Sequence, residues 1–571
     1  MADVVVPFRR GPPYGGVAGG CQHLNGRDEE DRVTVGLLKA VGNRAYTEVE
    51  SARLVLRTGV VSVESPATMV AAATAMLRYG TIAAGLTLSA ARYGNRTAVI
   101  DELGSLTFAE LEERSNRLAN AWRARGLRGG EGVAILARNH RGLLEAVFAA
   151  AKCGARIILL NTDFAGPQIR DVATREGTDL LVYDEEYGEM LADVAPRHGT
   201  WRAWTEKTRP DCLEALIAEG DPSPPPAPGA MPKLILLTSG TTGTPKGAPR
   251  AEPKSLAALG ALLSKVPFRA GEVTECCAPI FHTLGFACAM LGLGFGSTLV
   301  IRRRFDPQTT IESMERHRVT TVIAVPVMLA RIVDLGGRAL VGRDLTALRI
   351  IFVGGSQLGA QLARDLTGLF GPVVYNVYGS TEVAYATIAT PDDLAVEPGC
   401  VGSPVLGARV EILDDRGRRV PTGTTGRIFV GNSVQFEGYT GGGGKERVRG
   451  LMSSGDVGHF DAAGRLFIDG RDDDMIVSGG ENVFPAEVEE LLHTHTEIRE
   501  AAVIGVDDER FGARLRAFVV RQPDATLTEE DTKAFVKRNL ARYKVPRDVV
   551  FLDELPRNPT GKVLKKRLRE L

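Results

Sequence analysis

The chain has 571 residues, of which 44% are hydrophobic and 24% are charged, a composition typical of folded globular proteins. Its length exceeds what one hydrophobic core usually supports, so we expect at least two domains. The 69 Lys and Arg residues nearly balance the 70 Asp and Glu residues, which excludes a whole-molecule field that would attract nucleic acid.

Residues 1–67 are rich in Gly, Pro and charge without clear periodicity, and we interpret them as an N-terminal extension of unknown role. They lack an apolar core followed by a small-residue cleavage site, so no secretory signal is indicated and a cytoplasmic location is expected. Apolar residues then recur at helical spacing over residues 69–93, and Thr107 with Glu110 predicts a capping box for a helix ending near Arg125.

Further along the chain, residues 133–136 and 156–160 have the pattern of buried strands, and residues 142–153 between them that of a helix. The strand pattern recurs at residues 319–325, 348–353 and 373–377. This alternation predicts an α/β fold, with a large N-terminal domain of mostly parallel sheets covered by helices over residues 68–472.

A smaller unit is expected over residues 473–571. Its predicted elements are a helix at 485–493, strands at 501–506 and 515–520, and a helix at 529–541. This order predicts a small, mobile α+β C-terminal domain.

Residues 276–301 contain no Asp, Glu, Lys or Arg and are long enough to span a bilayer. Because Pro279, His282 and glycines interrupt this segment, we interpret it as a buried strand, turn and helix that line a cavity. Peripheral membrane contact stays an open alternative, and the sequence carries no signal for an oligomeric state. The seven scattered cysteines lack the spacing of a metal site, so reduced thiols are expected.

A candidate phosphate-binding loop lies in LILLTSGTTGTPKG, residues 234–247, where an apolar strand leads into hydroxyl residues, glycines and one lysine. Glycines let the backbone approach a polyanion, hydroxyl and amide groups donate hydrogen bonds, and the lysine adds a full charge. The candidate residues are Thr238, Ser239, Gly240, Thr241, Thr242, Gly243 and Lys246. The loop does not align with a Walker A motif, and a flexible surface turn would not need four hydroxyl residues and a lysine.

The string TSGTTGTPKG resembles the signature of the adenylate-forming (AMP-binding) superfamily, and further motifs of that superfamily follow in order. The stretches GGENVFPAEVE and PIFH resemble acyl-CoA synthetases of the fatty acid CoA ligase type. The resemblance implies that the protein uses ATP and Mg²⁺ to activate a carboxylic acid as an acyl adenylate, and that coenzyme A then accepts the acyl group.

In NVYGSTE, the resemblance assigns Tyr378 to the adenine, Thr381 to the α-phosphate and Glu382 to Mg²⁺, with Asn376 and Gly379 also in the nucleotide site. The residue types suit these roles, because an aromatic face stacks on a base and Mg²⁺ prefers a carboxylate with phosphate oxygens.

Two further motifs complete the nucleotide site by resemblance. The turn in VGGS, with Gly354, Gly355 and Ser356, corresponds to the adenine-contacting turn, where the superfamily commonly has Gly-Ala-Pro. In SGDVG, Asp456 corresponds to the ribose contact, and Arg471 is expected to be a second one.

The C-terminal motifs are assigned in the same way. Asp473 corresponds to the hinge between the domains, and Gly479 and Gly480 correspond to the loop that admits the pantetheine arm. Lys562, in NPTGK, corresponds to the adenylation lysine, which would neutralise charge where two anions meet. The expected catalytic residues are Lys562, Thr381 and Glu382.

His282, in PIFHTLG, corresponds to the mouth of the acyl pocket, and Gly285 and Phe286 are expected to line that pocket. We interpret His282 as a pocket residue and not as a general base. The predicted activity is that of an acyl-CoA synthetase for a medium-chain or long-chain fatty acid. The alternatives are a fatty acyl-AMP ligase that loads a separate acyl carrier protein, and a nucleotide-binding regulatory protein without turnover.

Overall fold

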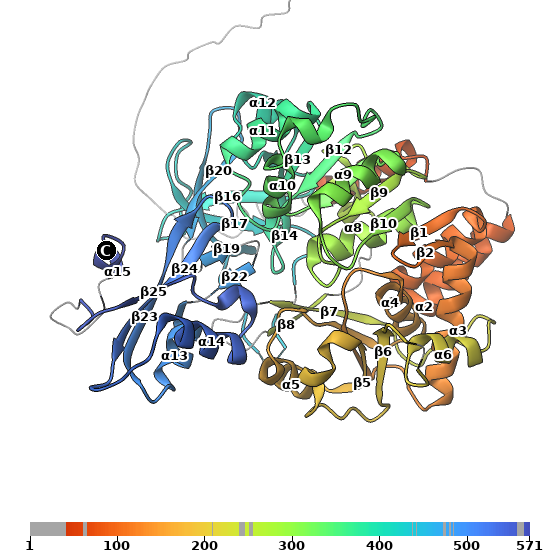
Figure 1. Cartoon of the computed structure of the whole chain (residues 1–571). Helices are drawn as coiled ribbons and strands as arrows, with labels where there is room; N and C mark the ends of the chain where they lie inside the picture. Colours follow the sequence, from red (N-terminus) through yellow and green to blue (C-terminus); the bar gives the residue numbers. More distant parts are fainter. Residues whose placement is uncertain are drawn as a thin grey trace, which may run out of the picture.

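The computed structural model describes most of the chain after residue 41. The described residues are 42–60, 66–207, 209–238, 246–250, 255–436, 438–440, 442–471, 476–478, 481–483, 485–556, 563 and 565–571. These residues form two sheets covered by helices, a third sheet beside them and a smaller C-terminal α+β region (Figure 1). The predicted α/β fold is confirmed, whereas the boundaries at residues 67 and 472 stay predictions.

The larger of the two helix-covered sheets is parallel at its centre and antiparallel at its edges. In pairing order its strands are β15 (Ser403–Pro404), β14 (Ala384–Ala389), β13 (Val374–Ser380), β12 (Ile350–Val353), β11 (Thr321–Ala324), β9 (Val273–Cys276), β10 (Thr298–Ile301), β1 (Thr97–Asp101) and β2 (Gly104–Thr107). The central strands are short and buried on both faces, as expected where helices cover a parallel sheet.

The second helix-covered sheet brings the strand of the predicted phosphate loop beside the first βαβ unit. Its order is β6 (Thr200–Trp204), β5 (Thr178–Asp184), β3 (Gly132–Leu136), β4 (Arg156–Leu159), β7 (Lys233–Thr238) and β8 (Lys246–Arg250). All of its neighbours are parallel except β7 and β8, which form an antiparallel pair.

Helices and short 3₁₀ turns pack on both sheets. They are α2 (Pro66–Tyr93), α3 (Phe108–Ala124), α4 (Arg141–Lys152), α5 (Gly166–Arg175), η1 (Glu185–Leu191), α6 (Leu213–Glu219), α7 (Ala257–Leu263), α8 (Thr283–Gly294), α9 (Pro307–Arg316), α10 (Pro326–Val333), η2 (Gly337–Leu340), α11 (Ala360–Phe370) and α12 (Pro391–Val396). The predicted capping box of Thr107 and Glu110 begins α3, and α2 is kinked at Gly80, where φ is 73°.

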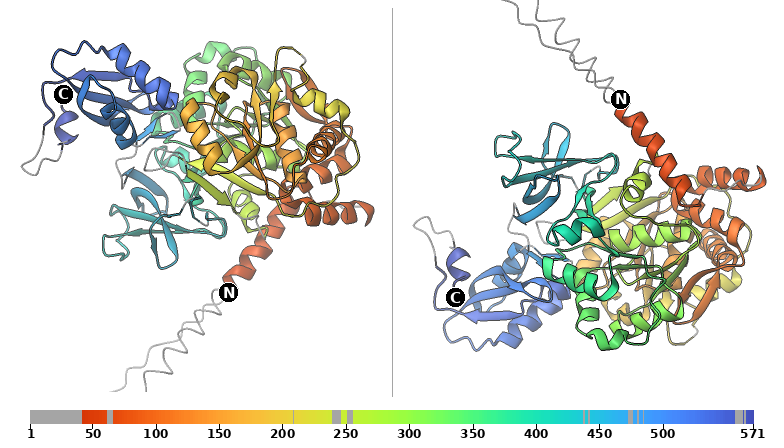
Figure 2. Two further views of the ribbon diagram at one scale, coloured as in Figure 1. Left: turned by 90° about the horizontal axis from the view of Figure 1, so that it is seen from below. Right: turned by 90° about the horizontal axis from the view of Figure 1, so that it is seen from above.

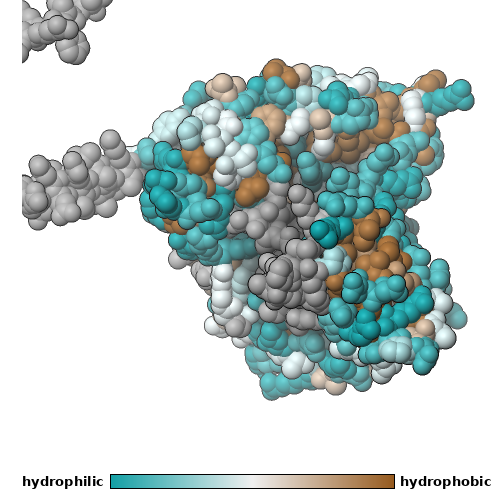
Figure 3. Space-filling model, turned by 90° about the vertical axis from the view of Figure 1, so that its left-hand side faces the viewer, coloured by the Kyte–Doolittle hydropathy of each residue, from teal (hydrophilic) through white to brown (hydrophobic). Residues whose placement is uncertain are grey.

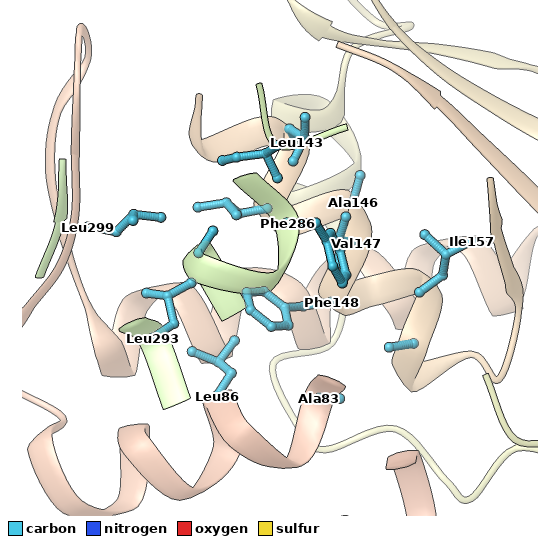
Figure 4. Close-up of a cluster of buried hydrophobic side chains, with 14 of the residues drawn as sticks. Ala83, Leu86, Leu143, Ala146, Val147, Phe148, Ile157, Phe286, Leu293 and Leu299 are labelled. Carbon is cyan, nitrogen blue, oxygen red and sulfur yellow. The ribbon is translucent and has the colours of Figure 1, made fainter. Parts of the chain in front are cut away.

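The main core lies between α2, α4 and α8, which join the two helix-covered sheets (Figure 4). Leu86 of α2, Phe148 of α4, and Phe286 and Leu293 of α8 are all nearly fully buried there. Because α8 is fixed from two sides by this core, its N-terminus has a set position relative to both sheets.

The third sheet and the C-terminal region lie side by side at one end of the molecule (Figure 2). The third sheet contains β16 (Arg409–Leu413), β17 (Gly426–Gly431), β18 (Arg447–Val448), β19 (Leu451–Phe460) and β20 (Leu466–Arg471). The C-terminal region contains β21 (Ile476–Ser478), β22 (Glu481–Val483), α13 (Pro485–His493), β23 (Ile498–Asp508), β24 (Gly512–Arg521), α14 (Glu529–Asn539), η3 (Arg542–Lys544), β25 (Asp548–Phe551) and α15 (Lys565–Leu568).

The apolar segment 276–301 forms the end of β9, helix α8 and β10, which confirms the predicted strand, turn and helix. Among the helices of the described ranges, none combines the length and the apolar character that crossing a bilayer requires. The arginines after this segment are held in ion pairs: Arg302 with Glu275, and Arg303 and Arg304 with Glu186. The face seen in Figure 3 is mostly hydrophilic, with apolar side chains in separate patches.

Part of the N-terminal extension packs against the body of the protein. Residues 42–57 form a helix, although their sequence shows no clear periodicity. Its Ser51 is fully buried against Gly260 of α7, where an added Cβ would lie 2.0 Å from the Ser51 Oγ. The helix is therefore fixed by a tertiary contact that the local pattern does not reveal.

Candidate functional site

The candidate site lies at the carboxyl ends of β12 and β13, the edge where ligands bind in open α/β sheets. β12 ends at Val353 and leads into Gly354 and Gly355, while β13 carries Tyr378 and leads into Glu382. Because the two strands pair in parallel, both predicted nucleotide motifs leave the sheet at the same edge.

Gly354 is required by the closeness of the two motifs. An added Cβ there would lie 2.5 Å from the Val377 Cγ1 and 2.9 Å from the Val377 carbonyl oxygen. Gly355 has a φ of 92°, in the region that favours glycine. The VGGS turn therefore has a backbone shape that larger residues would disturb, even though it departs from Gly-Ala-Pro.

The predicted adenine and ribose contacts are linked directly. The Tyr378 hydroxyl donates to the Asp456 Oδ2 at 2.6 Å, and Asp456 is 8% exposed. In the antiparallel pair of β19 and β20, Asp456 lies opposite Arg471. The third sheet thus brings both predicted ribose contacts to the end of β13, although they are separated from Tyr378 by many residues of sequence.

A chain of contacts joins the predicted phosphate lysine to the predicted metal ligand through Tyr439. The Lys246 Nζ lies 5.5 Å from the centre of the Tyr439 ring, and the Tyr439 hydroxyl donates to the Glu382 Oε1 at 2.8 Å. The Ser380 hydroxyl donates to the Glu382 Oε2 at 2.9 Å. Both carboxylate oxygens are therefore held in place by hydroxyl groups.

The donors around Glu382 fit a magnesium ion better than a metal held by protein ligands alone. Within the described ranges there is no group of three or more His, Cys, Asp or Glu side chains that could hold a metal. Mg²⁺ is usually bound by one or two carboxylates together with substrate phosphates and water. A single buried, oriented carboxylate near a lysine suits that mode of binding.

The N-terminus of α8 lies beside this nucleotide site. Thr283, its first residue, has its hydroxyl 3.3 Å from that of Thr381. Gly285 lies so close to the preceding turn that an added Cβ would be 2.2 Å from the Pro279 carbonyl oxygen. Phe286 packs in the core among side chains of α2 and α4, as Figure 4 shows, so its position is explained by packing.

His282 contacts the C-terminal region. Its Nε2 is 2.6 Å from the Glu481 Oε1, and the Asn161 amide also donates to that oxygen at 3.3 Å. Burial lowers the pKa of His282, but the Glu481 carboxylate outweighs it and raises the pKa above the ordinary value. Conversely, burial raises the pKa of Glu481, but His282 outweighs it and the pKa is lowered. The two side chains therefore form an ion pair.

Further contacts fix the C-terminal region in this arrangement. The buried Lys544 and Glu487 form an ion pair, and the Gln168 amide donates to Glu487 at 3.3 Å. The Arg542 amide donates to the Asp163 carbonyl oxygen at 3.2 Å. Glu481 is thus brought to His282 by an interface that includes buried polar contacts, and its position does not depend on one exposed side chain.

Several predicted site residues fall where the structure gives less information. Ser239, Gly240, Thr241, Thr242, Gly243, Asp473, Gly479, Gly480 and Lys562 lie outside the described residues. For Thr238 and Arg471 only the backbone is described, and Thr238 pairs with Lys246 at the start of β8. Asn376 and Gly379 lie on β13, and Ser356 lies in the turn that follows β12.

Two residues with central contacts, Tyr439 and Glu481, are missed by the sequence reasoning. Glu481 lies in the quoted stretch GGENVFPAEVE, but the chain alone does not show that it meets a histidine 199 positions away. Tyr439 precedes a glycine run and belongs to none of the assigned motifs. No pattern in the sequence distinguishes Tyr439 from an ordinary loop residue.

Comparison with known proteins gives a consistent result. The AMP-binding enzyme family model matches residues 86–440, and the model for the AMP-binding enzyme C-terminal domain matches residues 487–562. A fatty acid–[acyl-carrier-protein] ligase of Streptomyces coeruleorubidus is 31% identical over 83% of this chain and 93% of its own length. A feruloyl-CoA synthase of an Amycolatopsis species is 34% identical over 83% of this chain and 95% of its own.

Among solved structures, an amide bond synthetase of Marinactinospora thermotolerans has a TM-score of 0.76 and is 29% identical. The match covers 83% of this chain and 97% of the synthetase. The chain therefore belongs to the AMP-binding enzyme family and is an AMP-forming acid–thiol ligase of the acyl-CoA ligase type.

Proposed function

We propose that the protein is an ATP-dependent acyl-CoA synthetase that activates a medium-chain or long-chain fatty acid and transfers the acyl group to coenzyme A. The observation that carries this proposal is the contact between Glu481 and His282. It brings the hairpin of β21 and β22, the predicted entry for a pantetheine arm, against the mouth of the predicted acyl pocket. This arrangement is suited to attack on an adenylate by a thiol.

In the first half-reaction, a carboxylate oxygen attacks the α-phosphorus of ATP and pyrophosphate leaves. Lys246 offers a positive charge to the phosphates, while Tyr378 and Asp456 orient the adenosine. Thr381, beside the α8 N-terminus, is suited to contact the α-phosphate. Lys562, which lies outside the described residues, is the proposed group that neutralises the two anions as they meet.

Glu382 is the proposed ligand of Mg²⁺. When bound, the ion would neutralise charge that develops on the phosphate oxygens. The protein contributes a carboxylate that Tyr439 and Ser380 already orient.

In the second half-reaction, the thiol of coenzyme A attacks the acyl carbonyl carbon and AMP leaves with the bonding electrons. The proposed hinge at Asp473 and the loop of Gly479 and Gly480 would allow the C-terminal region to change places between the two steps. The described arrangement, with Glu481 on His282, corresponds to this second step in our proposal.

The fatty acid as substrate class is supported by sequence likeness. The stretches GGENVFPAEVE and PIFH resemble fatty acid CoA ligases, and a fatty acid–[acyl-carrier-protein] ligase is 31% identical to this chain. In the described arrangement Cys288 and Leu293 of α8 are packed in the core, and the cavity of about 10 Å³ beside Gly292 is no larger than a water molecule. An acyl chain along α8 would therefore need side chains to move.

Product mass spectrometry tests the proposal. The purified protein is incubated with Mg²⁺, ATP and acids of graded chain length, with aryl acids in parallel, and with or without coenzyme A. We expect acyl-CoA from medium-chain or long-chain acids only when coenzyme A is present. Acyl-AMP that accumulates while coenzyme A is ignored would favour a carrier-protein ligase, and no turnover with any acid would favour a regulatory protein.

A further inference from the structure

Tyr439 connects two groups that the proposed function assigns to different parts of ATP. Its hydroxyl donates to the Glu382 Oε1, and its ring faces the Lys246 Nζ. A phenol that makes both contacts fixes the distance between a carboxylate and an ammonium group. Because Glu382 follows β13 and Lys246 begins β8, the contact also joins the two helix-covered sheets.

The backbone around Tyr439 is held from both sides. The Phe436 amide donates to the Glu382 carbonyl oxygen at 3.0 Å, and the Phe436 and Tyr439 rings pack edge to face with centres 4.8 Å apart. On the other side, the Thr440 amide donates to the Gly247 carbonyl oxygen at 2.8 Å. The tyrosine is therefore attached to the segment of Glu382 through Phe436 and to the segment of Lys246 through Thr440.

Thr440 adds a second connection on the lysine side. Its hydroxyl accepts from the Gly247 amide at 3.0 Å and donates to the Glu176 Oε1 at 2.7 Å. An added Cβ at Gly247 would lie 2.5 Å from this hydroxyl, so the glycine lets the two segments approach each other. The position of Tyr439 is thus set by several independent contacts.

We propose that Tyr439 is a positioning residue that holds the Glu382 carboxylate and the Lys246 ammonium group at the spacing needed for a metal–triphosphate complex. This inference rests on the proposed function, because it needs Glu382 as a metal ligand. The Tyr439 hydroxyl acts on Glu382, and the Tyr439 ring acts on Lys246. Removing the hydroxyl alone and removing the whole ring are therefore expected to have different effects.

Calorimetric binding of ATP, without an acid substrate, separates the two effects and does not depend on turnover. The dissociation constant of ATP is measured once with Mg²⁺ and once with a chelator. The ratio of the chelator value to the Mg²⁺ value reports how much the metal tightens binding. Tyr439→Phe keeps the ring and removes the hydroxyl. Because partners that orient a metal ligand typically contribute tenfold or more to metal affinity, we expect the ratio to fall by about tenfold.

Tyr439→Leu removes the ring as well. It is expected to lower the same ratio and also to weaken metal-free ATP binding by about twofold to fivefold, the size of an exposed cation–π contact. Tyr439→Phe is expected to leave metal-free binding unchanged. Tyr385→Phe is the matched control, because the Tyr385 hydroxyl donates to the Ala258 carbonyl oxygen and so loses a comparable hydrogen bond nearby. Thermal unfolding of all variants measures any general loss of stability.

The outcomes distinguish this inference from the proposed function beneath it. If Glu382→Gln leaves the ratio unchanged, Glu382 is not the metal ligand and the assignment in the proposed function fails. If Glu382→Gln lowers the ratio but Tyr439→Phe stays within threefold of the wild type, only the role of Tyr439 is overturned. A fall of more than threefold in Tyr439→Phe, with Tyr385→Phe like the wild type, supports the inference.

Discussion

The ion pair of His282 and Glu481 gives a quantitative prediction about the thiol-dependent step. Glu481→Gln keeps the shape of the side chain but removes its charge. A hydrogen bond to a charged group contributes about 1.5–3 kcal/mol and a neutral one about 0.5–1.5 kcal/mol. The His282 and Glu481 side chains are 32% and 20% exposed, so solvent weakens their interaction. We therefore expect Glu481→Gln to reduce the interaction free energy of the pair by about 1 kcal/mol, near the lower end of the difference between the two ranges.

This loss applies only to the arrangement in which the two residues meet. If that arrangement performs acyl transfer, a loss of about 1 kcal/mol slows transfer by about fivefold. Adenylation is expected to be unchanged, because the contacts of Glu481 do not include the residues assigned to the nucleotide. Single-turnover transfer from supplied acyl adenylate to coenzyme A measures the first rate, and exchange of pyrophosphate into ATP measures the second.

A double-mutant cycle with His282→Gln tests whether the effect belongs to the pair. The control is Asp469→Asn, since Asp469 faces His459 at 2.9 Å and both side chains are 30% exposed. We expect Asp469→Asn to leave both half-reactions unchanged. Equal slowing of transfer and adenylation by Glu481→Gln, or strictly additive effects in the cycle, would refute the reasoning.

Three further predictions concern pH, the C-terminal lysine and a glycine. Because the pKa of His282 is raised, the ion pair is complete below about pH 6.5 and is lost as the pH rises through the raised value. Because the pKa of Glu481 is lowered, the pair is also lost in strong acid, as the pH falls through that lowered value. The transfer rates of the wild type and of Glu481→Gln are measured over this pH range, and their ratio does not depend on how far the thiol is ionised. We expect the ratio of wild-type to variant rate to fall toward alkaline pH. A ratio that does not change with pH would contradict the ion pair. Lys562→Ala is expected to abolish adenylation yet spare transfer from supplied adenylate, measured by the same two assays, and equal loss of both would contradict two arrangements. Gly354→Ala is expected to lower the free energy of unfolding in urea by about 1–3 kcal/mol because its Cβ would overlap β13, whereas Gly368→Ala, with open space around it, is not expected to destabilise.

Much of the fold could be predicted because its signals are local. The capping box of Thr107 and Glu110 predicts the start of α3, and the run of residues 485–493 predicts α13 with the observed bounds. The short buried strands β11 and β12 are marked by apolar runs that alternate with helices. Each of these signals depends on neighbours within a few positions, so one sequence is enough to find them.

The contacts within the site could not be predicted, because they join distant segments. Tyr378 and Asp456 are 78 positions apart, and Tyr439 and Glu382 are 57 apart. The motifs identify Tyr378, Asp456 and Glu382 one at a time. Which side chains contact one another depends on how the third sheet packs against β13. Tyr439 was missed altogether, since a tyrosine before a glycine run has no pattern that distinguishes it from a loop residue.

The contact between Ser51 and Gly260 has a consequence for where a truncated form of the protein can begin. The family match begins at residue 86, yet Ser51, Val55, Tyr79 and Ala83 are all buried, and all but Ser51 are part of the main core. A fragment that starts at the family boundary would leave α7 and α8 with apolar surface open to water, and we expect it to aggregate when expressed. We therefore expect a stable fragment of this ligase to keep both α2 and the helix of residues 42–57, which contribute Tyr79, Ala83 and Val55 to the core.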